Sequence, residues 1–272
     1  MESHDLWVGR ATVQVSVLGS FDFAAADGRR PVLSIGAQRL IAFLALRGDA
    51  VSRATAAGSL WPEVSDDHAS SSLRAALSRL DATTRDALAM RASTLRLADD
   101  VTVDIARSQD LAHRVLDADA VPDAEAAPAA AISVLTRDVL PDWYDEWVIP
   151  EADEWRRLRV AALEALSTRL AAAGKFAHAM SAALAAVRVD PLREDAVAAL
   201  IRVHLAEGNR ADALFEFRRY RARMLRELGV EPTDALYALV GVAPAATARR
   251  SEPRPDKWSE VERVRAAARR LA

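Results

Sequence analysis

The 272-residue sequence contains no cysteine and only two lysines, Lys175 and Lys257. The absence of cysteine excludes disulfides, thiolate metal sites and cysteine nucleophiles, and it suits a reducing cytoplasm. No run of about 18 apolar residues is present to span a bilayer. No basic region leads into an apolar stretch at the amino terminus, as it would in a signal peptide. We therefore expect a cytoplasmic protein that has no membrane partner.

The sequence also lacks the residue patterns of catalysis and of cofactor binding. It has no glycine-rich phosphate loop. Asp145 and Glu146 form a carboxylate pair, but no nucleophile, metal ligand or phosphate cradle lies near them in the sequence. The histidines are scattered without the spacing of metal ligands. We expect neither an enzyme, nor a metal, nor any other cofactor. The five histidines are His4, His68, His113, His178 and His204.

The composition that remains is that of a folded protein. Hydrophobic residues make up 51% of the chain and charged residues 28%, and the length suffices for two modest domains. The net charge of -3 neither favours nor excludes a nucleic-acid partner. Function must therefore be inferred from the pattern of elements along the chain.

The first segments read as strands. Residues 12–18 alternate polar and apolar side chains, which is typical of a half-buried strand. Asp27-Gly28 is a tight-turn signal, and the apolar residues 31–33 after it predict a second strand. From Gln38 onward the apolar spacing becomes helical, and Gly48 ends that helix.

Two further helices and a hairpin follow. Ser52 is the predicted N-cap of a second helix that runs to Leu60. A third helix is predicted over 68–82, and a β-hairpin over 88–103 that turns at Asp99-Asp100. Strands, three helices and a hairpin in this order predict a winged helix-turn-helix domain over residues 12–107. The predicted inner face of the third helix consists of Ala69, Leu73, Leu77 and Leu80.

The second half repeats itself. A loop or linker is expected over 118–130, and the chain then reads as helical to Val240. Four positions recur at a distance of 34 residues, the period of a tetratricopeptide helical hairpin, although an alanine-rich helical domain can also produce matches by chance. We therefore predict a mainly α protein with a small β component, in which an all-α, tetratricopeptide-like repeat domain occupies residues 108–240. The recurring positions are Ala162, Leu166, Gly174 and Ala179, followed by Ala196, Leu200, Gly208 and Ala213.

Taken together, the chain resembles the Streptomyces antibiotic regulatory protein family, which joins a winged helix-turn-helix to a bacterial transcriptional activator domain. In the first half the resemblance rests on VSVLG…DGRRPVL, GAQRLIAFLAL, Leu60-Trp61, ASSSLRAALSRL and Val103-Asp104. In the second half it rests on LPDWYDEWV, WRRLRVAALEAL, AAAGKFAHAM, AEGNRADAL and RELGVEP. It runs from Val13 to Leu239, and the order and spacing of the motifs are more specific than any single motif.

The resemblance implies a sequence-specific activator of a gene cluster, often one for secondary metabolism. Such a protein binds direct repeats in double-stranded promoter DNA as a homodimer, recruits RNA polymerase, and associates with the nucleoid when bound. The resemblance also assigns residues 108–240 to the activator domain. The sequence departs from the family pattern at Ser70-Ser71, where Arg-Asn is common, and at Asp81-Ala82, where extra arginines are usual.

DNA contacts are expected first on the third helix. Arg74 is the leading candidate for reading a base, because a guanidinium can bond a guanine edge at two points, while Arg79 at the flank suits a phosphate. Ser52 and Arg53 begin a helix and could present a backbone N–H and a charge to phosphate. Each arginine has an alternative reading as a solvated surface charge. The full set of candidates is Ser52, Arg53, Ser71, Arg74, Ser78, Arg79, Arg91 and Arg96, the last two on the wing.

The charge balance argues for more than one copy on DNA. Residues 1–110 contain 12 arginines and no lysine against 14 aspartates and glutamates, a net charge of -2. Non-specific DNA affinity comes mainly from neutralised phosphates, so one copy should bind weakly. A homodimer, or the basic tail expected to be mobile over 241–272, could supply the remainder. The basic residues of that tail are Arg249, Arg250, Arg254, Lys257, Arg263, Arg265, Arg269 and Arg270.

The sequence leaves open the role of one aromatic group and two alternative functions. Trp143, Tyr144 and Trp147 form an aromatic group, with the tryptophans four apart as on one helix face. We expect this group to pack between the two domains, and a ligand cage is the alternative. The weak charge balance leaves the alternative of a protein-interaction module that does not bind DNA and whose repeats bind a regulatory partner. A small molecule bound in the repeat groove is a third alternative.

Overall fold

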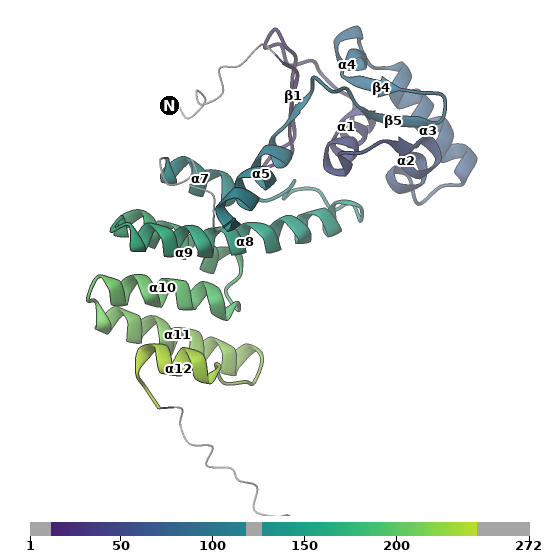
Figure 1. Ribbon diagram of the computed structural model, residues 1–272. Coiled ribbons are helices and arrows are strands. Elements are labelled where there is room, and N and C mark those ends of the chain that lie inside the picture. Colours follow the sequence, from purple (N-terminus) through teal and green to yellow (C-terminus); the bar gives the residue numbers. More distant parts are fainter. Residues whose placement is uncertain (1–11, 118–126, 244–272) are drawn as a thin grey trace, which may run out of the picture.

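The computed structural model describes residues 12–117 and 127–243 of the chain. Two small sheets and a group of short helices form the first part, and a stack of longer helices forms the second (Figure 1). This confirms the predicted fold class. The charged residues of the predicted tail lie outside the described residues. Within the described ranges, no helix is both long enough and apolar enough to cross a membrane.

The first sheet has β1 (Gln14–Ser16) at its centre. It pairs antiparallel with β2 (Asp22–Ala24) and parallel with β6 (Thr102–Val103). The predicted strand over 31–33 is wrong: Val32 is fully exposed, and Phe23 of β2 is buried instead. Pro31 has no N–H to donate to a ladder, which makes that segment the poorer partner for β1. The predicted turn does form, at Gly28 with φ +80°.

The second sheet forms the wing. Its order is β3 (Val51–Ser52), β5 (Thr94–Leu97) and β4 (Leu88–Met90), all antiparallel. The hairpin turns over 91–93, where the Arg91 N–H donates to the Thr94 carbonyl at 2.9 Å. The hairpin therefore spans 88–97 and not 88–103 as predicted. The chain does turn at Asp99-Asp100, where the Val101 N–H donates to the Ala98 carbonyl at 3.1 Å, but that turn follows the hairpin instead of closing it. After Leu97 the chain crosses to the first sheet, where parallel pairing with β1 gives the next strand its partner.

Three helices pack beside the wing: α1 (Ile35–Arg47), α2 (Arg53–Leu60) and α3 (Asp66–Ser78). The Ser34 hydroxyl accepts from the Ala37 N–H, so α1 begins three residues before the predicted start, and Gly48 ends it at φ +69° as predicted. Ser52 caps α2 as predicted, because its hydroxyl accepts from the Thr55 N–H at 2.9 Å.

The third helix is shorter than predicted but presents the predicted face. It ends at Ser78 rather than at residue 82, because Asp81 caps a new short helix, α4 (Ala82–Asp86), by accepting from the Thr84 N–H at 2.8 Å. The four predicted inner residues are all buried, which confirms the apolar face. They are Ala69, Leu73, Leu77 and Leu80.

The second part of the chain is helical. Pro128 starts α7 inside the predicted linker, because proline is favourable in a first helical turn. The predicted continuous helical region is interrupted over 136–147, where the chain is irregular. The helices are α5 (Asp104–Leu116), α7 (Pro128–Leu135), α8 (Val148–Ala172), α9 (Phe176–Val189), α10 (Glu194–Ala206), α11 (Arg210–Glu227) and α12 (Asp234–Val240).

The 34-residue repeat corresponds to two helical hairpins, α8–α9 and α10–α11. Gly174 and Gly208 make the two turns with φ of +72° and +82°, a conformation that suits glycine because it has no Cβ. The small side chains Ala179 and Ala213 are fully buried, so neighbouring helices approach closely. The repeat is therefore structural, and not a coincidence of composition.

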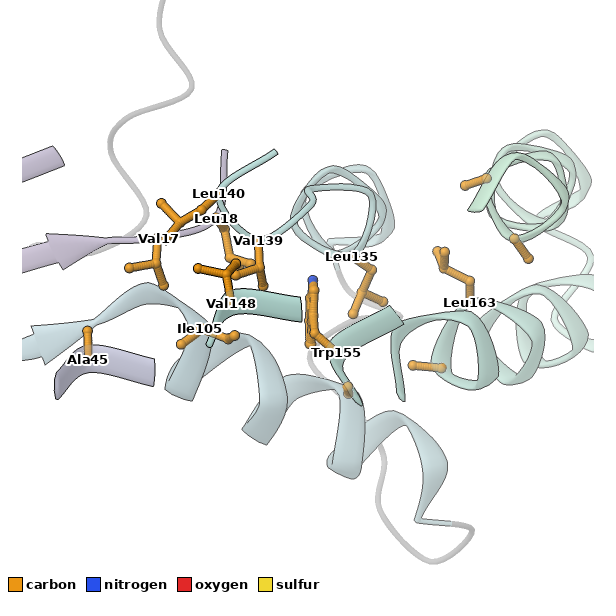
Figure 2. Packing of buried hydrophobic residues seen from close by; sticks show 14 of the residues in the cluster. Val17, Leu18, Ala45, Ile105, Leu135, Val139, Leu140, Val148, Trp155 and Leu163 are labelled. Carbon is orange, nitrogen blue, oxygen red and sulfur yellow. The ribbon is translucent and has the colours of Figure 1, made fainter. Parts of the chain in front are cut away.

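The two parts share one hydrophobic core (Figure 2). Residues 138–140 run beside the end of β1: Leu18 forms a β-bridge with Val139, and the Leu140 N–H donates to the Val17 carbonyl at 3.0 Å. Leu140 is buried with φ +39°, a rare conformation for leucine that the surrounding contacts hold in place.

The Asp104 carboxylate strengthens this junction from the other side. It accepts the backbone N–H groups of Val17 and Leu18 at 2.8 and 3.1 Å. Burial raises the pKa of Asp104, while these two hydrogen bonds act in the opposite direction and favour its ionised form. Helix α5 begins at Asp104 and runs across the predicted domain boundary between residues 107 and 108, so the hydrophobic core continues across that position. The boundary itself stays a prediction.

Candidate nucleic-acid interface

The exposed side of α3 is the centre of the candidate interface. Leu73 and Leu77 turn inward, while Ser71 and Arg74 are exposed on the opposite side. The Ser71 hydroxyl donates to the Asp67 carbonyl at 2.8 Å and accepts from one Arg74 Nη atom at 2.8 Å. Ser71 therefore holds the guanidinium of Arg74 along the helix. Arg74 is exposed, and among the described residues no carboxylate pairs with it.

Ser78 and Arg79 end the same helix. The Ser78 hydroxyl donates to the Ala75 carbonyl at 3.0 Å, which leaves its oxygen able to accept. Arg79 is exposed at the C-cap of α3, where a cation is also favourable toward the helix dipole. Its position suits a phosphate contact at the flank of the helix, and the dipole gives it a purely structural alternative.

A second group of candidates meets where α2 begins beside the wing. Two guanidinium nitrogens of Arg53 approach the Arg91 carbonyl at 3.4 Å, and the Arg53 N–H donates to the Ser93 carbonyl at 2.9 Å. The Thr55 N–H is bonded to Ser52. The N–H groups of Arg53 and Thr55 are therefore already bonded, and the expected phosphate contact at the start of α2 stays a prediction. The side chains of Ser52 and Arg91 remain exposed.

The Arg96 side chain forms its hydrogen bonds outside these two groups of candidates. Its two Nη atoms bond the two carboxylate oxygens of Asp99, and one Nη also donates to the Leu97 carbonyl at 3.2 Å. The hydrogen bond that Arg96 donates to Asp99 raises the pKa of Arg96, and the same bond lowers the pKa of Asp99. This pairing occupies the fork that would bind a phosphate, so Arg96 is the weakest of the eight candidates.

The aromatic group lies at the junction of the two parts, as predicted. The Trp147 ring meets the Phe43 ring of α1 edge to face at 5.3 Å, and Trp143 lies between Trp147 and Phe21. The expectation that both tryptophans lie on one helix is wrong, because α8 starts only at Val148. Tyr144 is 90% exposed and takes no part in this packing.

The junction also contains two ion pairs that the sequence did not reveal. Arg39 of α1 pairs with Asp145 at 2.5 Å, and Arg47 of α1 pairs with Glu151 of α8 at 3.4 Å. Burial raises the pKa of Glu151, although Arg47 acts in the opposite direction. One exposed edge of α1 is thus attached to the helical part, which fixes the orientation of the α2–α3 unit relative to the repeats. No local pattern signals these pairs, since they join residues about a hundred positions apart.

This architecture is similar to that of known proteins. Residues 103–241, about half of the chain, match the family described as the bacterial transcriptional activator domain. No curated protein matches the chain. A solved structure described as Mycobacterium tuberculosis EmbR in complex with a low affinity phosphopeptide is similar, with a TM-score of 0.63 and 24% sequence identity. The match covers 85% of this chain and 64% of that chain, so this chain spans less than two thirds of its length. At this identity the likeness shows a common fold.

Proposed function

The chain belongs to the family of the bacterial transcriptional activator domain, a family of activators and not of enzymes, and on that premise we propose a sequence-specific DNA-binding regulator of the Streptomyces antibiotic regulatory protein type. It activates a gene cluster, such as one for secondary metabolism, by binding direct repeats in promoter DNA as a homodimer and recruiting RNA polymerase. It acts in the cytoplasm, on the nucleoid. Residues 12–107 form the DNA-binding part of this proposal, and residues 108–240 form the activator part.

The exposed side of α3 is the observation that carries the proposal. Arg74 projects from a helix whose other side is buried, lacks a carboxylate partner among the described residues, and is held by Ser71. A guanidinium in this setting can bond the O6 and N7 atoms of guanine together when the helix lies in a major groove. Arg79 and Arg91 suit phosphates on either side of it.

Electrostatics limits what one copy can do. The net charge of -2 over residues 1–110 leaves few cations for phosphates, and Arg96 is already neutralised by Asp99. Specific binding by this protein therefore depends on correct base contacts and on a second copy. The same charge balance predicts that the affinity for a single half-site depends only weakly on the salt concentration.

A mobility-shift assay on the upstream regions of neighbouring genes tests the proposal. Arg74→Ala should weaken binding by about 1–3 kcal/mol, which is about 5- to 150-fold, and should relax the preference at one base pair. Arg188→Ala is the matched control, since Arg188 is an exposed helical arginine of α9, outside the DNA-binding part. Folded protein that gives no sequence-dependent shift at low salt would refute the proposal.

The acidic balance of residues 1–110 favours one competing function. In this alternative the protein does not bind DNA, and the tetratricopeptide-like repeats bind a regulatory partner. The same assay separates the two, because this alternative predicts that wild type and Arg74→Ala behave alike on every DNA sequence. A uniform loss across all sequences would instead identify Arg74 as a phosphate contact.

A further inference from the structure

The outward side of α11 is an exposed surface that the repeat architecture does not require. Phe215, Arg218, Ala222 and Leu225 follow one another at intervals of three and four residues, so they lie on one side of the helix; we call them the α11 face. Phe215 is 61% exposed and Leu225 is 39% exposed. The opposite side packs into the core through Ala213, Phe217, Tyr220 and Met224.

The preceding repeat shows what this position needs for folding alone. Thirty-four residues earlier, Ser181, Leu184 and Arg188 of α9 occupy the places of Phe215, Arg218 and Ala222, and they are also exposed. A serine satisfies the fold at the first of these places. An exposed phenylalanine there gains nothing from the interior of its own copy, and a large apolar side chain beside arginine is typical of a protein–protein contact.

The charge of α11 specifies the partner. The helix contains six arginines and three acidic residues. Several arginines are paired along the helix surface, as Arg219 is with Glu216, but Arg218 has no carboxylate partner in the described part of the chain. The α11 face therefore suits a segment that combines carboxylates with an apolar side chain. Residues 244–272 of the same chain carry more basic than acidic residues, which is the wrong charge for this face.

The chain carries a segment of the required chemistry at residues 63–67, just before and at the start of α3. Glu63, Asp66 and Asp67 are exposed there and form no ion pair among the described residues, and Val64 between them is 46% exposed. This acidic loop lies at the far side of the molecule from α11, so one copy cannot join the two surfaces (Figure 1). DNA phosphates repel its carboxylates, which leaves it available for a protein contact.

We propose that the α11 face of one copy binds residues 63–67 of a second copy, with Phe215 against Val64 and Arg218 against the carboxylates. This inference rests on the proposed function in one respect: direct repeats relate two bound copies without a two-fold axis, so the copies must meet through two different surfaces. Such a contact is weak in solution and becomes strong when DNA holds two copies side by side.

Disulfide trapping tests the contact directly, because the native chain contains no cysteine. Phe215→Cys protein is mixed with Val64→Cys protein under mild oxidation, and the product is separated on a non-reducing gel. We expect the mixed disulfide to form at least fivefold faster than with Ser181→Cys in place of Phe215→Cys. Equal rates for the two positions, or a product dominated by Phe215→Cys paired with itself, would overturn the proposal.

Charge exchange gives a second, independent test. In the trapping pair, Arg218→Glu in the Phe215→Cys partner should reduce the yield severalfold, and Glu63→Arg in the Val64→Cys partner should restore it. An unchanged yield in Arg218→Glu contradicts the contact. Binding of each variant to DNA with a single half-site is measured in parallel. Wild-type protein that gives no sequence-dependent binding even to DNA with two half-sites refutes the DNA function, whereas the trapping result judges the contact by itself.

Discussion

The buried arginine of α8 leads to a prediction about the junction. Arg159 is 3% exposed, pairs with Asp138, and donates to the Arg137 carbonyl at 2.6 Å. Burial lowers the pKa of Arg159, and Asp138 only partly compensates by raising it. We predict that Asp138→Asn destabilises the protein more than Arg159→Met, although each substitution removes the same ion pair.

The magnitudes follow from what each substitution leaves behind. Removing one partner of a buried pair costs about 3–5 kcal/mol, because the other charge stays buried without compensation. The Asp138 side chain is 62% exposed, which reduces the loss to about 1–3 kcal/mol for Asp138→Asn. Arg159→Met removes the buried charge and a buried Nε–H that has no acceptor. The Arg137 carbonyl keeps its bond from Trp155 at 2.9 Å, so the expected change is within about 1 kcal/mol.

Urea denaturation monitored by tryptophan fluorescence measures both changes as shifts of the midpoint at constant slope. The double variant should be no less stable than Arg159→Met alone, because Asp138→Asn loses its cost once the buried cation is gone. Asp153→Asn is the control at the exposed pair between Arg156 and Asp153, and it should change stability by less than about 0.5 kcal/mol. A larger loss in Arg159→Met than in Asp138→Asn would refute the reasoning.

Three further predictions concern single elements. The Tyr220 hydroxyl donates to the Leu192 carbonyl, and burial raises the pKa of Tyr220 to about 12. The stabilisation by the neutral phenol is therefore complete below pH 10 and is lost as the pH rises toward 12. Tyr220→Phe should flatten the alkaline part of a plot of unfolding free energy against pH. Gly208→Ala should destabilise by about 1 kcal/mol at its positive φ, while Gly58→Ala in open helical surroundings should stabilise by about 0.5–1 kcal/mol, both by thermal unfolding. Ser52→Ala should cost about 1 kcal/mol in urea through loss of the α2 cap, and an unchanged midpoint would contradict that role.

Local features of this protein were predictable from its sequence. The cap at Ser52, the helix end at Gly48, the buried side of α3 and the turns at Gly174 and Gly208 all depend on residues within a few positions of one another. Helical hydrogen bonds join residues four apart, so side-chain periodicity and capping residues record them directly. The repeat period adds the pairing of helices, because each hairpin repeats the contacts of the one before it.

Only the tertiary structure decided how these parts meet. The parallel pairing of β6 with β1, the bridge from Leu18 to Val139 and the ion pair from Arg39 to Asp145 join segments distant in sequence, and many alternative partners satisfy the same local pattern. The candidate interface depends on both levels. The helical spacing of apolar residues predicted that Arg74 points outward. Only the folded wing showed that Arg96 is paired and that the Arg53 N–H is bonded. Those outcomes depend on side chains meeting in space, which a spacing along the chain does not specify.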